Sequence, residues 1–97
     1  MLLWLFLSLF ALASPSYAWG ASIDAKAKGL AHYIIALCDD LNGESAQAIS
    51  EYQKSVKFNG LEPAPRLKLG AYYLRLDQVD QAQIQLKAVT RLSPQES

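Results

Sequence analysis

The residues that could do chemistry are few, and they lie close together in the sequence. The single histidine, His32, is followed by the single cysteine, Cys38, and then by Asp39 and Asp40. His32 and Cys38 are six positions apart, so a helix of 3.6 residues per turn places them on different faces. Adjacent aspartates point about 100° apart on a helix and do not converge as a catalytic pair. We therefore interpret His32 as a boundary residue, Cys38 as a small core residue and the two aspartates as a solvated helix end.

Motifs that gather catalytic groups or cofactors are missing from the sequence. It contains no C-x-x-C, no H-E-x-x-H and no glycine-rich phosphate loop. Nine basic residues balance nine acidic ones, whereas nucleic acids and anionic membrane surfaces require clustered positive charge. A lone cysteine cannot form an internal disulfide. The composition predicts a protein that is not an enzyme, holds no metal or cofactor and does not bind nucleic acid.

Residues 1–20 form the most apolar part of the chain. An apolar run of about a dozen residues begins at Leu2, which is the length of a secretory signal, whereas a spanning helix needs about 20. Pro15 follows the run, and the small residue Ala18 suits a signal peptidase. We predict a signal peptide over residues 1–18 and an exported chain. Because no Lys or Arg precedes the run, an uncleaved membrane anchor over residues 2–20 is the alternative.

Beyond Gly20, turn-forming residues divide the chain into four segments of helical length. They span residues 23–41, 45–58, 65–76 and 80–92, and Pro65 suits the first turn of the third. Apolar residues recur three or four positions apart in each segment, which predicts an all-α fold. The expected core-facing residues are Ala31, Ile34, Ile35 and Cys38 in the first segment, Ala48, Ile49, Tyr52, Ser55 and Val56 in the second, Leu69, Tyr72, Tyr73 and Leu76 in the third, and Ala82, Leu86 and Val89 in the fourth.

The second and fourth segments repeat each other, because Ala48 aligns with Ala82 and Tyr52 with Leu86 at one common offset. That offset is about 34 residues, the period of the helix-turn-helix unit called the tetratricopeptide repeat, whose pattern includes L-G-x2-Y…A-x3-F…P. Here Leu69, Gly70, Tyr73, Ala82, Leu86 and Pro94 keep that spacing. The sequence therefore resembles a tetratricopeptide repeat protein, with copies over residues 29–62 and 63–97 after a lead-in over residues 19–28.

The resemblance implies antiparallel helix hairpins that stack as a short right-handed solenoid, preceded by an apolar N-terminal helix. Small residues such as Gly70 and Ala82 would let two helices cross closely. The residues expected to pack the repeats are Ala48, Tyr52, Leu69, Gly70, Tyr73, Ala82, Leu86 and Pro94.

The first copy departs from the pattern at several positions. Its opening Trp is replaced by His32, and the 34-residue offset places Asp39 where the second copy has Tyr73. Shifting the first helix by one residue would put Cys38 at that position, but the shift would lose the small Ala36 at the helix crossing. We prefer the unshifted alignment, with Asp39 near enough to the helix end to reach water.

In the resembled family, the first helix of each repeat lines a concave groove that holds a peptide or a partner helix. By resemblance, the groove residues here are Tyr33, Leu37, Leu67, Ala71, Leu74 and Arg75. The alternative is that a neighbouring repeat covers this face. The expected function is an exported, non-catalytic scaffold or assembly module that binds a protein or peptide; the alternative is a membrane-anchored structural subunit of an envelope complex.

Two repeats are few, because each unit buries its apolar face against neighbours and about three are usually needed. We therefore expect the chain to be a piece of a longer array, or to associate with another chain or a second copy. In the latter case Ile84 and Ala88 would lie at the interface.

Overall fold

A computed structural model describes residues 23–92 of the protein. These residues form four helices joined by short turns: a first helix over residues 23–41, α2 (Ser45–Phe58), α3 (Pro63–Arg75) and α4 (Val79–Leu92). The prediction of an all-α fold is confirmed for this part of the chain. The predicted signal peptide over residues 1–18 and Pro94 lie outside the described residues.

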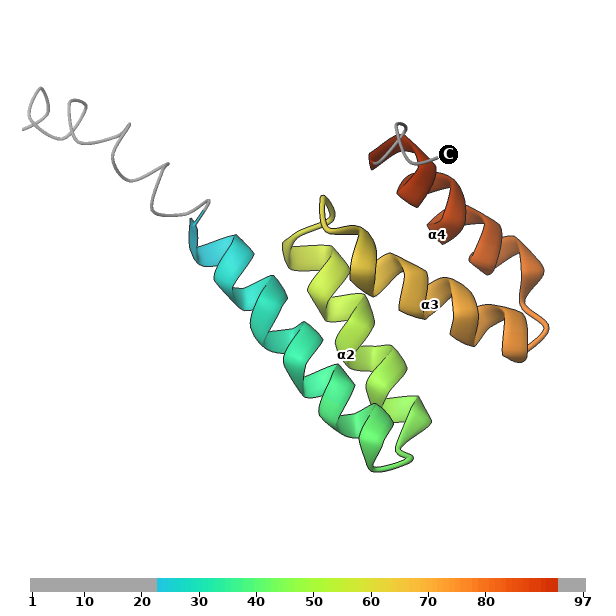
Figure 1. The fold of residues 1–97 in the computed structure, drawn as a ribbon, viewed down its shortest axis with the longest axis horizontal. Coiled ribbons are helices and arrows are strands. Elements are labelled where there is room, and N and C mark those ends of the chain that lie inside the picture. Colours follow the sequence, from blue (N-terminus) through green and yellow to red (C-terminus); the bar gives the residue numbers. More distant parts are fainter. Residues whose placement is uncertain (1–22, 93–97) are drawn as a thin grey trace, which may run out of the picture.

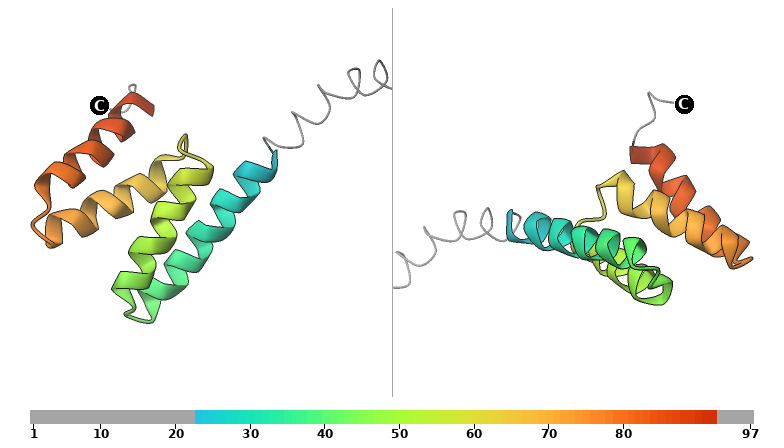
Figure 2. Two further views of the ribbon diagram at one scale, coloured as in Figure 1. Left: turned by 180° about the vertical axis from the view of Figure 1, so that it is seen from behind. Right: turned by 60° about the horizontal axis from the view of Figure 1, so that its bottom comes forward.

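The helices are arranged as two hairpins. The 23–41 helix runs antiparallel to α2, and α3 runs antiparallel to α4 (Figure 1). The second hairpin lies against the first through α3, which contacts both α2 and α4. Views from behind and from below show the same order, with the 23–41 helix and α4 on opposite outer sides (Figure 2).

Helix boundaries agree with the predicted segments to within two residues: α3 ends at Arg75 and α4 begins at Val79, each one residue earlier than predicted. α3 begins at Pro63, two residues earlier than predicted, because its first backbone N–H groups have no partner inside the helix and two prolines are tolerated there. Pro65 is consequently the third helical residue, and it is buried. Residues 23–28 belong to the predicted lead-in and to the predicted helical segment 23–41, and they are helical and continue without a break into Gly29.

The turns inside the two hairpins have the same backbone geometry. In the first, the Glu44 N–H donates to the Asp39 carbonyl; in the second, the Gln78 N–H donates to the Tyr73 carbonyl. Three other backbone hydrogen bonds of the first hairpin recur at the equivalent positions of the second. In the first hairpin they run from the N–H of Asn42 to the carbonyl of Cys38, from Gly43 to Asp40 and from Ala48 to Glu44. Both turns reverse at a residue with positive φ, Gly43 (75°) and Asp77 (60°), as in a Schellman helix end. The backbone thus follows the unshifted alignment.

The core is built from small and aromatic residues. It consists of Ala36, Ala48, Tyr52, Leu69, Tyr72, Tyr73 and Ala82. Ala36, Ala48 and Ala82 are fully buried. Gly70 is also buried, and a Cβ added there would lie 2.9 Å from Leu86 Cδ2. The two hairpins therefore place small residues at corresponding positions, Ala36 in one and Gly70 in the other.

Leu86 is half-buried beside Gly70, and Val89 is also half-buried on the inner side of α4. Leu76, expected in the core, is exposed because α3 ends just before it.

The expected core face of the first helix is wrong. Ala31, Ile34, Ile35 and Cys38 are exposed, and the helix instead turns Gly29 and Ala36 toward the core, with Tyr33 and Leu37 packed against its edge. This helix is apolar on both of its faces, so periodicity alone chose the wrong one. Cys38 is accordingly an exposed thiol and not a core residue.

Candidate partner-binding surface

The α3 half of the predicted groove is an exposed apolar row. Leu67, Ala71 and Leu74 follow one another at spacings of four and three positions, which places them on one face of α3. All three are exposed, and the guanidinium of Arg75 beside them lies 4.4 Å from the centre of the Tyr72 ring. These three residues, here called the α3 row, are accessible to solvent, and the row ends beside the cation–π contact between Arg75 and Tyr72.

The half contributed by the first helix is different. Tyr33 and Leu37 are half-buried and pack against the core, with the Tyr33 ring centroid 5.9 Å from that of Tyr52. Tyr33 therefore presents only part of its ring to solvent. The role of these two residues in partner binding stays a prediction.

A pocket of about 300 Å³ opens between the first helix, the end of α2 and the start of α3. Its walls are mainly apolar, and its lining residues are Lys26, Gly29, Leu30, Tyr33, Ser55, Asn59, Glu62, Ala64 and Pro65. Of the predicted groove residues, only Tyr33 lines it.

Leu30 and Ala64 also line the pocket but were not predicted as site residues, although their sequence positions could have indicated them. They occupy equivalent positions in the two repeats, and they precede Tyr33 and Leu67 by one helical turn. Extending the predicted row by that turn would have found them.

A carboxylate at the end of the first helix joins three helices. Asp40 accepts hydrogen bonds from the hydroxyls of Tyr52 on α2 and Tyr72 on α3. Burial, followed by the hydrogen bond to Asp40, raises the pKa of the Tyr52 hydroxyl, so this group stays protonated and donates. Asp40 was predicted as part of a solvated helix end; it is instead half-buried and bonded. Asp39, its neighbour, is half-buried near that end.

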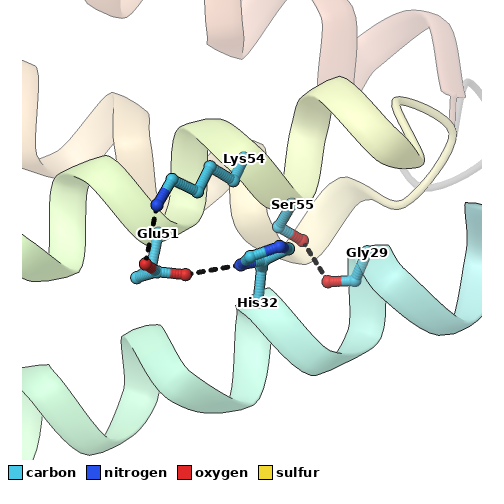
Figure 3. Close-up of polar contacts among 5 residues, drawn as sticks. All are labelled: Gly29, His32, Glu51, Lys54 and Ser55. Carbon is cyan, nitrogen blue, oxygen red and sulfur yellow. Dashed lines mark hydrogen bonds and ion pairs between the residues drawn. The ribbon is translucent and has the colours of Figure 1, made fainter.

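A second polar group ties the first helix to α2. His32 Nδ1 lies 2.5 Å from Glu51 Oε2, and Lys54 donates to Glu51 Oε1 at 3.1 Å (Figure 3). The imidazole also stacks on Phe58, with ring centroids 5.4 Å apart. The hydroxyl of Ser55 donates to the Gly29 carbonyl at 2.7 Å.

The arrangement in Figure 3 holds two helices together and does not assemble a nucleophile with a base. The hydroxyl of Ser55 is bonded to a backbone carbonyl, whereas the imidazole of His32 is bonded to Glu51. Among residues 23–92 no cluster of three metal-ligating side chains occurs, and no helix combines the length and apolarity needed to cross a bilayer.

The carboxylate of Glu51, which contacts His32 and Lys54, is expected to make a pH-dependent contribution to the stability of the fold. The hydrogen bond with His32 lowers the pKa of Glu51 below its value of about 4.3 in an unfolded chain. A carboxyl with a lowered pKa stabilises the fold above the unfolded value, and that contribution is lost as the pH falls through the folded value. We expect Glu51→Gln to lower the free energy of unfolding by roughly 1 kcal/mol at pH 7 and by much less at pH 3.

Urea denaturation followed by circular dichroism at both pH values measures this difference. Glu44→Gln is the matched control, because Glu44 is exposed and its side chain forms no capping hydrogen bond at the start of α2. If Glu51→Gln lowers the free energy of unfolding as much at pH 3 as at pH 7, the loss does not come from the ionised carboxylate and the prediction is wrong.

No protein-family model matches the chain, and neither the curated proteins nor the solved structures include a significant match to it. The geometry of the chain itself is therefore what points to a function.

Proposed function

We propose that the protein is a tetratricopeptide-type module, with its two hairpins stacked as a short right-handed solenoid, that binds a protein or peptide partner and has no catalytic activity. The observation that carries the proposal is the exposed α3 row of Leu67, Ala71 and Leu74. The recurrence of the turn hydrogen bonds at equivalent positions of the two hairpins supports the repeat assignment.

The chemistry that we propose for the partner rests on the pocket beside this row. Leu30, Tyr33 and Pro65 offer an apolar lining, so an aliphatic or aromatic side chain of the partner would fill the space. Lys26 and Glu62 also line the pocket, and they offer one charge of each sign to the partner's backbone or polar groups. A segment that places one apolar side chain in the pocket and others along α3 fits this surface.

Affinity purification from the native host tests the proposal with a matched pair of variants. Leu74 and Leu76 are almost equally exposed, at 52% and 53%, but only Leu74 lies in the α3 row. We expect a partner that is retained by the wild type and by Leu76→Glu and is lost with Leu74→Glu. Equal recovery of every bound protein by both variants would contradict a binding role for the α3 row.

We also propose that the chain is exported after cleavage behind Ala18, because the apolar run that begins at Leu2 has the length of a secretory signal and the small residue Ala18 suits a signal peptidase. N-terminal sequencing of the protein recovered from cells tests this directly. A mature chain that starts at Trp19 supports export, whereas an intact Met1 on a membrane-bound protein supports the anchored structural subunit.

A further inference from the structure

The first hairpin, which comprises the 23–41 helix and α2, carries α3 on one side (Figure 1). Asp40 accepts a hydrogen bond from the Tyr72 hydroxyl, and the centroid of the Tyr52 ring lies 6.3 Å from that of Tyr72. Gln53 donates to the Tyr73 hydroxyl at 2.8 Å. The structure therefore shows which surface of a hairpin receives the helix that follows it.

The second hairpin, which comprises α3 and α4, presents the equivalent surface to solvent. The α3 row occupies the positions that Tyr33, Leu37 and Asp40 hold one repeat earlier. Those three residues are half-buried in the first hairpin. The α3 row is exposed, with Leu67 at 48% and Leu74 at 52%. Positions that are partly covered in one hairpin are thus open in the other.

The second helices of the two hairpins differ in the same way. On α2, Tyr52 is fully buried and Ser55 is 2% exposed. Their equivalents on α4, Leu86 and Val89, are only half-buried. Within residues 23–92, α4 is the outermost helix on its side of the molecule (Figure 2). The equivalent surface on the second hairpin is here called the helix seat, and it consists of Leu67, Ala71, Leu74, Leu86 and Val89.

We propose that the helix seat binds an α-helix of the partner, held on the second hairpin as α3 is held on the first. The inference rests on the proposed function, because it names the class of partner for the same surface. One repeat earlier this surface is an interface within the protein, and its occupant there is a helix. An amphipathic helix laid on an apolar groove is also a common mode of recognition between proteins.

Two exchanges between the hairpins define the residue that the partner helix places at the centre of the seat. Leu74 replaces Asp40 and Leu86 replaces Tyr52, so aliphatic side chains stand where α3 finds two oxygen-bearing ones. A tyrosine hydroxyl would find no acceptor in either leucine, and burying it without a hydrogen bond is unfavourable. We therefore expect an apolar residue without a hydroxyl at the position that Tyr72 holds in α3.

A third exchange adds charge to the edge of the seat. Lys87 replaces Gln53, which reaches across to Tyr73 in the first hairpin. Lys87 is exposed and forms no ion pair with a described residue, and the same holds for Arg75 at the end of the α3 row. We therefore expect Asp or Glu in the partner helix directly after its apolar residue, at the position of Tyr73, where the carboxylate meets Lys87.

Extending the full chain by a further helix pair tests whether the seat accepts a helix. A copy of residues 63–92 joined directly after Glu96 supplies an α3 helix at the spacing of the repeat. We expect this extended chain to unfold at a higher urea concentration than the wild type, because neighbouring repeats stabilise one another through their interface. Leu74→Glu is expected to abolish the gain in the extended chain and to change little in the unextended chain, where Leu74 is exposed.

Leu76→Glu is the matched control, because Leu76 is as exposed as Leu74 but lies outside the seat. It is expected to preserve the gain in stability. An extended chain that is no more stable than the wild type, or a gain that Leu74→Glu leaves intact, overturns the proposal.

Tyr72→Phe tests how the helix lies on the seat. In the original α3 this substitution removes the hydrogen bond to Asp40 and is expected to lower the urea midpoint. In the added copy the hydroxyl would face Leu74 and Leu86, so the same substitution is expected not to lower it. Equal drops at the two sites would show that the added helix does not lie as α3 does, and would overturn the inferred arrangement.

The partner recovered in the purification above separates this inference from the proposed function. Lys87→Glu is expected to weaken its binding by roughly tenfold, because an attraction to the partner's carboxylate becomes a repulsion. Lys57→Glu, which changes an exposed cation on α2, is expected to leave binding unchanged. If Leu74→Glu releases the partner but Lys87→Glu does not weaken it, the α3 row still binds the partner and the helix seat is wrong.

Discussion

Replacing Tyr52 with alanine is expected to remove a large fraction of the free energy of unfolding. Tyr52 is fully buried at the centre of the core, where its ring contacts Tyr33 and Tyr72. Removing a buried aromatic side chain costs about 3–5 kcal/mol. A chain the length of the described part, residues 23–92, would have a total stability of about 4–10 kcal/mol at the usual stability per residue. The loss is therefore from about a third to all of the free energy of unfolding.

Urea denaturation followed by far-ultraviolet circular dichroism measures the change. Tyr52→Phe keeps the ring and removes only the hydrogen bond to Asp40, so its expected cost is smaller, about 1–2 kcal/mol. Leu74→Ala, at an exposed position, is the control and should cost less than about 0.5 kcal/mol. A Tyr52→Ala protein as stable as Leu74→Ala would refute the described core.

The second large effect is expected from Gly29→Ala. A Cβ at this position would lie 2.9 Å from Asn59 Cβ and 3.3 Å from the Ser55 carbonyl oxygen. Both atoms belong to, or are fixed by, the backbone at the end of α2, so they cannot rotate away. The two helices must separate, at a cost of about 1–3 kcal/mol. The hydrogen bond from Ser55 to the Gly29 carbonyl would stretch with them.

Gly70→Ala is the matched control for this prediction. Its added Cβ would also approach to 2.9 Å, but the neighbour is Cδ2 of Leu86, the end of a flexible side chain. The helix propensity gained from glycine to alanine, up to about 1 kcal/mol, offsets that contact. Thermal unfolding of both variants is expected to show a clear drop in Tm for Gly29→Ala and little change for Gly70→Ala. Equal drops would contradict the distinction between rigid and flexible neighbours.

The sequence predicts the later part of the fold better than the earlier part. The 34-residue offset places Ala48 and Ala82 correctly at buried positions, because small residues at a helix crossing must recur with the repeat. The bounds of α2 are predicted without error, since Asn42-Gly43 and Asn59-Gly60 mark its limits. For the first helix, apolar residues on both faces leave periodicity without a preference, and the buried face was missed.

The candidate site, like the fold, could be predicted only in part from the sequence. The resemblance placed the predicted groove on α3, and the helical spacing of Leu67, Ala71 and Leu74 puts all three on one exposed face of that helix. The pocket could not be predicted, since it depends on how the start of α3 approaches the first helix. Asp40 was also misread, because its two tyrosine partners are 12 and 32 residues away and sequence periodicity does not report such pairings.

The hydrogen bonds of Asp40 restrict movement between the two hairpins. Its carboxylate receives one hydroxyl from α2 and one from α3, so the first helix and these two helices meet at a single hydrogen-bonded junction. Hinge motion between the hairpins would have to break that junction inside a half-buried site, where hydrogen bonds to a charged group are strong. A partner of the proposed kind would therefore meet a stiff surface whose shape is set in advance, and little conformational entropy would be lost on association.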